Sequence, residues 1–120
     1  LTGPEILTGS TRLKAGTATK MALNMISTIA MIKLGKVYKN RMVDVSATNN
    51  KLVDRSIRII QYFTDVDRTK ALELLRTTNG SVKLSLLVSL LNIDIESAKQ
   101  LLEGSDGNVR KALGFNIKAD

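Results

Sequence analysis

The residues that could do chemistry gather in the first 14 positions of the chain. Glu5 is the only acidic residue among the first 43, and Arg12 and Lys14 follow it closely. Ser10 and Thr11 stand between them, and both are good N-cap residues. A helix that begins there would direct free N–H groups, two hydroxyls and two cations toward one place, which suits an anion and most simply a phosphate. The structural alternative is a capped helix with a salt bridge to Glu5, because such capping patterns are common.

The element that must position these residues is a long helix, predicted from Thr11 or Arg12 to Leu34. Gly9 frees the backbone just before it, and Gly35 is expected to end it as a C′ residue. Apolar residues occupy most of its circumference. A helix this apolar is expected to be buried on more than one side, so we predict that it packs against a parent domain and a second subunit.

A longer pattern around this helix start resembles a known family. The segments that carry the resemblance are Gly3-Pro4-Glu5, Thr8–Thr17, Leu23–Met25, Leu34–Tyr38, Met42–Val45 and Ala47–Asn49. Together they resemble the signature of the N-acetylmuramic acid 6-phosphate etherases, which share it with the glucokinase regulatory protein. At Lys39 and Arg41 this family usually carries smaller or apolar residues, and we regard those two positions as peripheral.

The resemblance implies the function of a longer protein. Etherases of this family are lyases that cleave the D-lactyl ether of N-acetylmuramic acid 6-phosphate during peptidoglycan recycling in the cytoplasm. The products are N-acetylglucosamine 6-phosphate and D-lactate. The reaction is an elimination across the sugar C2–C3 bond followed by addition of water, with a carboxylate base and a second acid that assists the leaving lactate. The resemblance places the catalytic glutamates upstream, in a sugar-isomerase-type (SIS) α/β domain, so we expect the present chain to be a C-terminal part that is inactive alone.

By the same resemblance, five residues are candidates for binding a phosphorylated amino sugar, and no residue of this chain is assigned as catalytic. The five candidates are Glu5, Ser10, Thr11, Arg12 and Lys14. The resemblance also implies a homodimer. The alternative is a non-catalytic regulatory protein that binds phosphosugars, as the glucokinase regulatory protein does. Two catalytic carboxylates upstream would favour the enzyme, whereas a tandem repeat of the sugar domain would favour the regulator.

Beyond the long helix, the pattern is mixed and then helical again. Residues 43–45 alternate between apolar and acidic side chains, which is a weak signal for a strand and equally fits an extended connector. Thr48 or Asn49 is expected to cap a second helix that runs to about Phe63. Its polar side chains are predicted to face water, namely Lys51, Arg55, Arg58 and Gln61.

An internal repeat with an offset of 27 residues follows. Asp67 and Asp94 are its expected N-caps, and Gly80 and Gly107 are expected to close the helices that those caps begin. The repeat predicts four short helices, over 68–78, 82–91, 95–103 and 109–113. They resemble the ubiquitin-associated-like bundle attached to this etherase family. Such a bundle could bind a partner helix or peptide, but we favour one that covers the main domain and closes over the substrate site.

These elements predict an all-α fold for this chain, joined to an α/β sugar-isomerase-type protein. We divide the chain into four parts. Residues 1–46 end the sugar-isomerase-type domain, 47–65 form a linking helix, 66–115 form the bundle and 116–120 form a frayed tail.

Composition excludes several classes of function. The chain has no His and no Cys, which removes the commonest general base and metal ligand as well as disulfides, and we expect neither a metal nor a cofactor. The net charge of +7 could attract nucleic acid, but the basic residues are scattered and the chain has only four aromatic rings, two Tyr and two Phe. The longest charge-free stretch, 21–32, is shorter than the roughly 20 residues of a membrane span. We therefore expect no nucleic acid and no membrane as partners.

Overall fold

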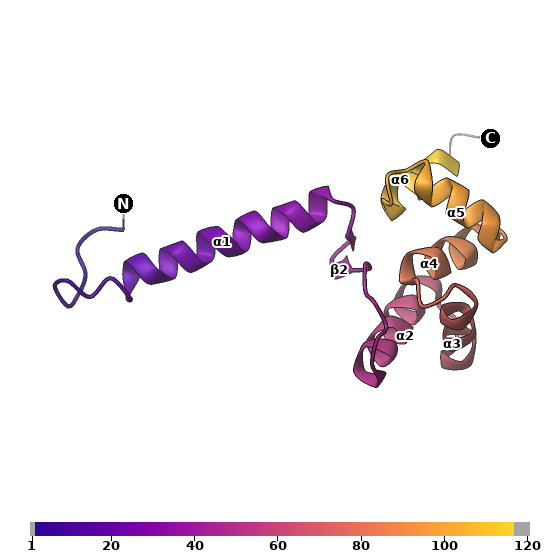
Figure 1. Cartoon of the computed structure of the whole chain (residues 1–120), viewed down its shortest axis with the longest axis horizontal. Coiled ribbons are helices and arrows are strands. Elements are labelled where there is room, and N and C mark those ends of the chain that lie inside the picture. The colour runs from indigo at the N-terminus through magenta and orange to yellow at the C-terminus, as the bar shows by residue number, and fades with distance from the viewer. Residues whose placement is uncertain (1, 117–120) are drawn as a thin grey trace. The chain divides into compact units, whose positions relative to one another are not determined.

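A computed structural model describes residues 2–116, with side-chain environments given for residues 2–114. The described chain is mostly helical with little strand, which confirms the predicted all-α fold (Figure 1). It divides into two compact units after Lys33.

The first unit contains a loop and the helix α1, which spans Lys14–Lys33. The predicted start of this helix at Thr11 or Arg12 is wrong, because residues 11–13 form turns instead. The amide of Leu13 donates to the carbonyl of Ser10 at 3.3 Å, which is a turn and not an α-helical spacing. Regular α-helical hydrogen bonds begin only with the residues that follow this turn.

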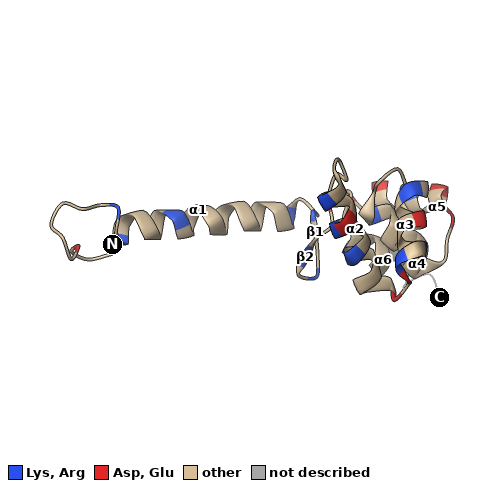
Figure 2. Cartoon of the chain, turned by 90° about the horizontal axis from the view of Figure 1, so that it is seen from below, with Lys and Arg blue, Asp and Glu red and all other residues tan. Residues whose placement is uncertain are grey.

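No residue of α1 is buried in the described chain. Its apolar side chains are exposed and few of its positions are charged, as the mostly tan helix in Figure 2 shows. The exposed side chains include Met21, Leu23, Met25, Ile26, Ile29 and Ile32. The predicted burial of this helix against a parent domain and a second subunit therefore stays a prediction.

The second unit begins at Leu34, and Gly35 and a short hairpin follow. Gly35 has a φ of +67°, which confirms its predicted place after the end of the long helix. Strands β1, Val37–Tyr38, and β2, Arg41–Met42, pair antiparallel, with Val37 opposite Met42. The possible strand at 43–45 does not form, because the amides of Val43 and Asp44 both donate to the carbonyl of Lys36, at 3.0 and 3.4 Å, and not to successive residues of a partner strand. The alternation of apolar and acidic side chains at 43–45 instead reflects the burial of Val43, which is 1% exposed.

Helix α2 spans Asn50–Thr64 and is part of the core. Its predicted cap at Asn49 is confirmed, because the Asn49 side chain accepts a hydrogen bond of 3.0 Å from the amide of Leu52. We predicted a linking helix here. The structure instead packs α2 against α3 and α4 through a buried face that consists of Ser56, Ile57, Ile59 and Ile60.

Four short helices complete the second unit. They are α3, Arg68–Thr77, α4, Val82–Leu91, α5, Ile95–Glu103, and α6, Val109–Asn116. The first three agree with the predicted ranges to within one residue. Helix α6 extends past its predicted end at residue 113. The predicted frayed tail lies outside the described residues from 117 onward.

The internal repeat is visible in the backbone. Asp67 and Asp94 cap α3 and α5, as predicted, by accepting backbone hydrogen bonds of 2.8 and 2.9 Å. Gly80 and Gly107 follow the same two helices with φ values of +80° and +69°. Each donates its amide to a carbonyl five residues back, at 2.7 and 2.9 Å, and so closes the helix before it.

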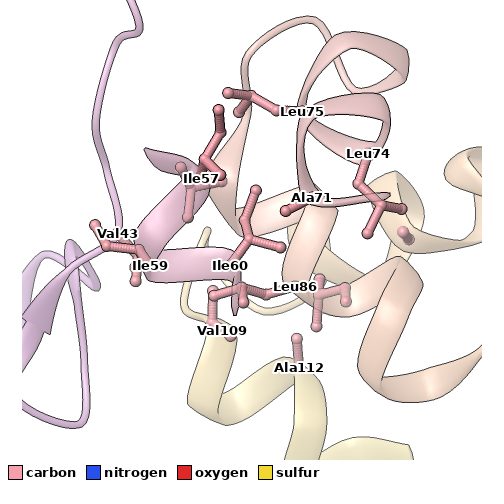
Figure 3. Packing of buried hydrophobic residues seen from close by; sticks show 13 residues of the cluster. Val43, Ile57, Ile59, Ile60, Ala71, Leu74, Leu75, Leu86, Val109 and Ala112 are labelled. Carbon is pink, nitrogen blue, oxygen red and sulfur yellow. The ribbon is translucent and has the colours of Figure 1, made fainter. Parts of the chain in front are cut away.

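The core of the second unit lies where α2 meets the repeat (Figure 3). Ile60 on α2 and Leu86 on α4 are fully buried. Two pairs of residues that are equivalent in the repeat share the same burial. These pairs are Ala71 with Ala98, both 0% exposed, and Val82 with Val109, both 1% exposed. Both copies of the repeat therefore contribute to one core.

Candidate functional site

The segment before α1 turns back on itself so that residues far apart in the loop meet the first turn of the helix. Gly9 has a φ of +79°, a conformation that favours glycine. The amide of Ser10 donates to the carbonyl of Leu7 at 3.0 Å, and that of Thr11 donates to the carbonyl of Gly9 at 3.1 Å. This turn brings Glu5 to the start of α1.

The Glu5 carboxylate caps α1. Its Oε2 accepts a hydrogen bond of 3.0 Å from the amide of Lys14, and its Oε1 accepts one of 3.0 Å from the amide of Ala15. These amides belong to the first turn of the helix, where backbone donors have no intrahelical partner and the helix dipole favours negative charge. The expectation that Ser10 or Thr11 caps the helix is therefore wrong, because the Glu5 carboxylate reaches those amides from outside the helix.

Arg12 and Lys14 line one open pocket beside the helix start. The pocket has a volume of about 620 Å³ and is lined by Thr2, Arg12, Leu13, Lys14, Thr17, Ala18 and Met21. The Lys14 ammonium donates to the carbonyl of Pro4 at 3.0 Å, so it also ties down the loop. Arg12 makes neither a hydrogen bond nor an ion pair with the residues described, and its guanidinium is exposed.

The structure brings together some of the five predicted site residues but not all. Glu5 and Lys14 meet at the helix start, although through a backbone amide and not as a salt bridge. Arg12 joins Lys14 in the pocket. Ser10 and Thr11 lie in the preceding turn and are not among the pocket-lining residues. Their hydroxyls make no hydrogen bond within residues 2–114.

A second polar cluster, which the sequence analysis missed, lies in the second unit. Asp44 pairs with Lys36 at 2.9 Å and with Lys83 at 3.3 Å. The Lys83 side chain is only 12% exposed and also donates to the carbonyl of Gly107 at 2.9 Å. The pKa of Asp44 is lowered mainly by the hydrogen bond from Lys36. Partial burial raises this pKa, whereas the charge and the hydrogen bond of Lys83 lower it further.

The Asp44 cluster connects the chain after the hairpin to α4 and to the turn before α6. Sequence spacing could not find it, because Lys83 and Asp44 stand 39 positions apart. A cluster of this kind has the contacts of a structural ion pair.

Arg41, which we regarded as peripheral, also lies at a polar site. Its guanidinium carbon stands 4.0 Å from the centroid of the Tyr62 ring, a cation–π distance. Arg41 lines a pocket with basic residues of α2. Nothing in the sequence indicated that β2 and α2 face each other here.

Among residues 2–116, no group of three or more acidic side chains is placed to hold a metal ion. In the same part of the chain, no helix combines the length and the hydrophobicity needed to cross a bilayer.

Comparison with known proteins agrees with the predicted resemblance. Residues 39–85 match a family model described as the C-terminal lid domain of glucokinase regulatory protein. The chain is 65% identical over 113 residues to the N-acetylmuramic acid 6-phosphate etherase of Prochlorococcus marinus (strain NATL1A). The aligned stretch covers 94% of this chain and 36% of that protein. It is 58% identical over 120 residues to the N-acetylmuramic acid 6-phosphate etherase of Gloeothece citriformis (strain PCC 7424). That alignment covers 100% of this chain and 39% of that protein.

These findings confirm the resemblance to the etherases and to the glucokinase regulatory protein. The similarity extends over nearly all of this chain. The chain spans well under half the length of these relatives, 36% and 39% of the two named.

Proposed function

Because this chain is similar to a part of the N-acetylmuramic acid 6-phosphate etherases, we propose that it is part of such an enzyme. The whole protein would be a lyase that converts N-acetylmuramic acid 6-phosphate to N-acetylglucosamine 6-phosphate and D-lactate. The role of this chain would be to bind the phosphorylated sugar at the start of α1. The catalytic carboxylates would come from the sugar-isomerase-type domain that the resemblance implies.

The observation that carries the proposed role is the placement of Arg12 and Lys14 in one pocket beside the start of α1. Two cations next to a helix start create a positive potential that favours a phosphate. Ser10 and Thr11 would add hydroxyl donors from the preceding turn. Glu5 would hold that turn in place through its two backbone hydrogen bonds.

The proposal extends to assembly and location. We expect a homodimer, and the exposed apolar face of α1 supports a role for this helix in burying surface against other parts of the protein. The resemblance implies a cytoplasmic enzyme of peptidoglycan recycling. Sedimentation of the whole protein at micromolar concentration would test the dimer directly.

A regulatory function is the second candidate. The match of residues 39–85 to the lid domain of glucokinase regulatory protein favours it. Such a protein would bind the same class of phosphorylated sugar without releasing lactate. An assay for D-lactate with N-acetylmuramic acid 6-phosphate and the whole protein separates the two functions.

The binding role is tested by Arg12→Ala in the whole protein. Charge-assisted hydrogen bonds contribute roughly 1.5–3 kcal/mol, so loss of a direct phosphate contact should weaken binding of the phosphorylated sugar about tenfold or more. Binding of the same sugar without its phosphate should change little. Isothermal titration of both sugars measures the two effects.

Lys20→Ala is the matched control, because Lys20 is an exposed cation of α1 that does not line the pocket. Lys14→Ala should give a mixed result, since it also removes the hydrogen bond to the Pro4 carbonyl. Equal losses for the two sugars in Arg12→Ala would remove the phosphate role of this residue.

A further inference from the structure

A second pocket lies between the hairpin and α2, in the second unit. It has a volume of about 410 Å³, within the range of small-molecule sites. The hairpin contributes three of its lining residues and α2 contributes five. They are Asn40, Arg41, Met42, Lys51, Asp54, Arg55, Arg58 and Ile59. Figure 2 shows blue basic segments on both of these elements.

The single carboxylate of this pocket is already paired. Asp54 binds Arg58 at 2.8 Å and Arg68 at 2.7 Å. The hydrogen bond from Arg68 is the main cause that lowers the pKa of Asp54. Asp54 therefore stays ionised at neutral pH, and its charge is balanced by two guanidinium groups.

Three cations of the pocket remain without a carboxylate partner. No acidic side chain described here lies within 4.0 Å of the charged nitrogens of Arg41, Lys51 or Arg55. Lys51 and Arg55 stand four positions apart on α2, where like charges repel. Such a cluster raises the local potential, and an anion between the cations would relieve the repulsion.

Arg41 is held in place more firmly than an ordinary surface arginine. Its guanidinium lies over the ring of Tyr62, and the hairpin fixes its backbone opposite Tyr38. Its Nε is buried without a hydrogen-bond partner in the described structure. A buried donor without an acceptor is unfavourable, and a small shift of the guanidinium onto an anion in the pocket would remove that cost.

We infer that the pocket between β2 and α2 binds a small molecule through its phosphate group. Three unpaired cations match a doubly charged phosphate better than a single carboxylate, and the planar guanidinium groups of Arg41 and Arg55 suit phosphate oxygens. A nucleic acid strand fits less well, because Arg41 already covers one face of the Tyr62 ring that could otherwise stack a base. This inference does not depend on the proposed function.

The test is a titration of the 120-residue chain followed by residue-resolved amide NMR. The probes are inorganic phosphate, N-acetylglucosamine 6-phosphate and N-acetylglucosamine. The first two should shift the amides of residues 40–42 and 51–58 saturably, and the third should not. Equal affinities for the two phosphorylated probes would identify the phosphate group alone as the ligand, whereas tighter binding of the sugar phosphate would add the sugar to it.

Arg41→Gln and Arg55→Gln should each weaken phosphate binding about tenfold, by loss of a charge-assisted contact. Arg55 is fully on the surface of α2, so its replacement keeps the test valid even if Arg41→Gln disturbs the hairpin. The matched control is Arg76→Gln, an exposed cation on α3 outside the pocket.

Three results would overturn the inference. The first is an equal loss in Arg76→Gln, which would indicate a diffuse charge effect. The second is an equal response to the sugar without phosphate. The third is a single-stranded oligonucleotide that shifts the same amides at lower concentration than either phosphorylated probe.

Discussion

At the start of α1, the Glu5 carboxylate caps the helix, a role that we predicted for Ser10 or Thr11. Glu5 accepts both of its hydrogen bonds from backbone amides. Its charge therefore acts on the helix dipole and the free N–H groups, and not on a neighbouring side-chain cation. We expect the turn before α1, which contains Arg12, to be held by these two hydrogen bonds.

Glu5→Gln should loosen the first turn of α1 in the 120-residue chain. The glutamine would place an NH₂ group against one backbone amide and would lose the charge that the dipole favours. Loss of a cap costs about 1 kcal/mol, so hydrogen exchange at Lys14 and Ala15 should accelerate roughly fivefold. Glu103→Gln, at an exposed position on α5, is the control. Unchanged exchange at both amides would show that the cap contributes nothing to the helix.

The Asp44 cluster makes the stability of the second unit depend on pH. Because the folded-state pKa of Asp44 lies below its ordinary value of 3.8, its contribution to stability is complete above about pH 4. The contribution is lost as the pH falls through the folded-state pKa. Asp54 and Asp94, whose pKa values are also lowered, act in the same direction.

Asp44→Asn should therefore lower the melting temperature at pH 7 and reduce its fall between pH 7 and pH 3. Asp44 is 39% exposed, so solvent screening limits the loss at pH 7 to about 1 kcal/mol. Thermal unfolding of both proteins at the two pH values measures the effect. If the variant lost as much stability in acid as the wild type, the ion pairs with Lys36 and Lys83 would not be the cause.

At the scale of elements, two equivalent turns and one glycine contact organise the second unit. The turns after α3 and α5 share their conformation, and each is followed by a capped helix. The side chain of Asn108 caps α6 by accepting from the amides of Arg110 and Lys111 at 3.0 and 3.2 Å. Gly35 packs directly against this cap.

Gly35→Ala should destabilise the second unit by about 1–3 kcal/mol. A Cβ at this position would stand 3.1 Å from both the Cα and the Cβ of Asn108, and the φ of +67° is unfavourable for alanine. Urea unfolding followed by circular dichroism measures the loss.

Gly114→Ala is the matched control for this prediction. Gly114 lies within α6 and a Cβ there meets nothing within 4 Å, so alanine should stabilise that helix by up to about 1 kcal/mol. A Gly35→Ala variant as stable as the wild type would mean that the chain before the hairpin does not dock on α6.

At the scale of the whole molecule, the two units differ in what holds them. The second unit has a continuous core, whereas α1 buries no residue in the described chain. Most of the stability of helices in proteins comes from packing of an apolar face. We therefore expect α1 to gain its stability in the whole protein from contacts with other parts of that protein.

In the 120-residue chain, amide exchange in α1 should be much faster than in α2 and α4, because local opening of α1 exposes no core. In the whole protein, the same α1 amides should become protected. Hydrogen–deuterium exchange on both proteins measures the difference. Equal exchange of α1 in the two proteins would contradict the prediction that this helix is buried by a parent domain and a second subunit.

The sequence by itself determined the helical elements and the family resemblance. Caps such as Asn49, Asp67 and Asp94 and closing glycines such as Gly80 act within a few residues, so their patterns are local. The offset of 27 likewise predicted two equivalent helical pairs. The resemblance rested on strings read in order along the chain, which is why the comparisons could confirm it.

Only the tertiary structure decided what these elements bring together. The Glu5 cap, the Asp44–Lys83 pair and the stacking of Arg41 on Tyr62 join residues that are 9 to 39 positions apart. Whether such groups meet depends on how loops turn and helices pack, and no local propensity encodes that. For the same reason the sequence predicted α2 as a linker, although its apolar face had the right spacing for the core in which it lies.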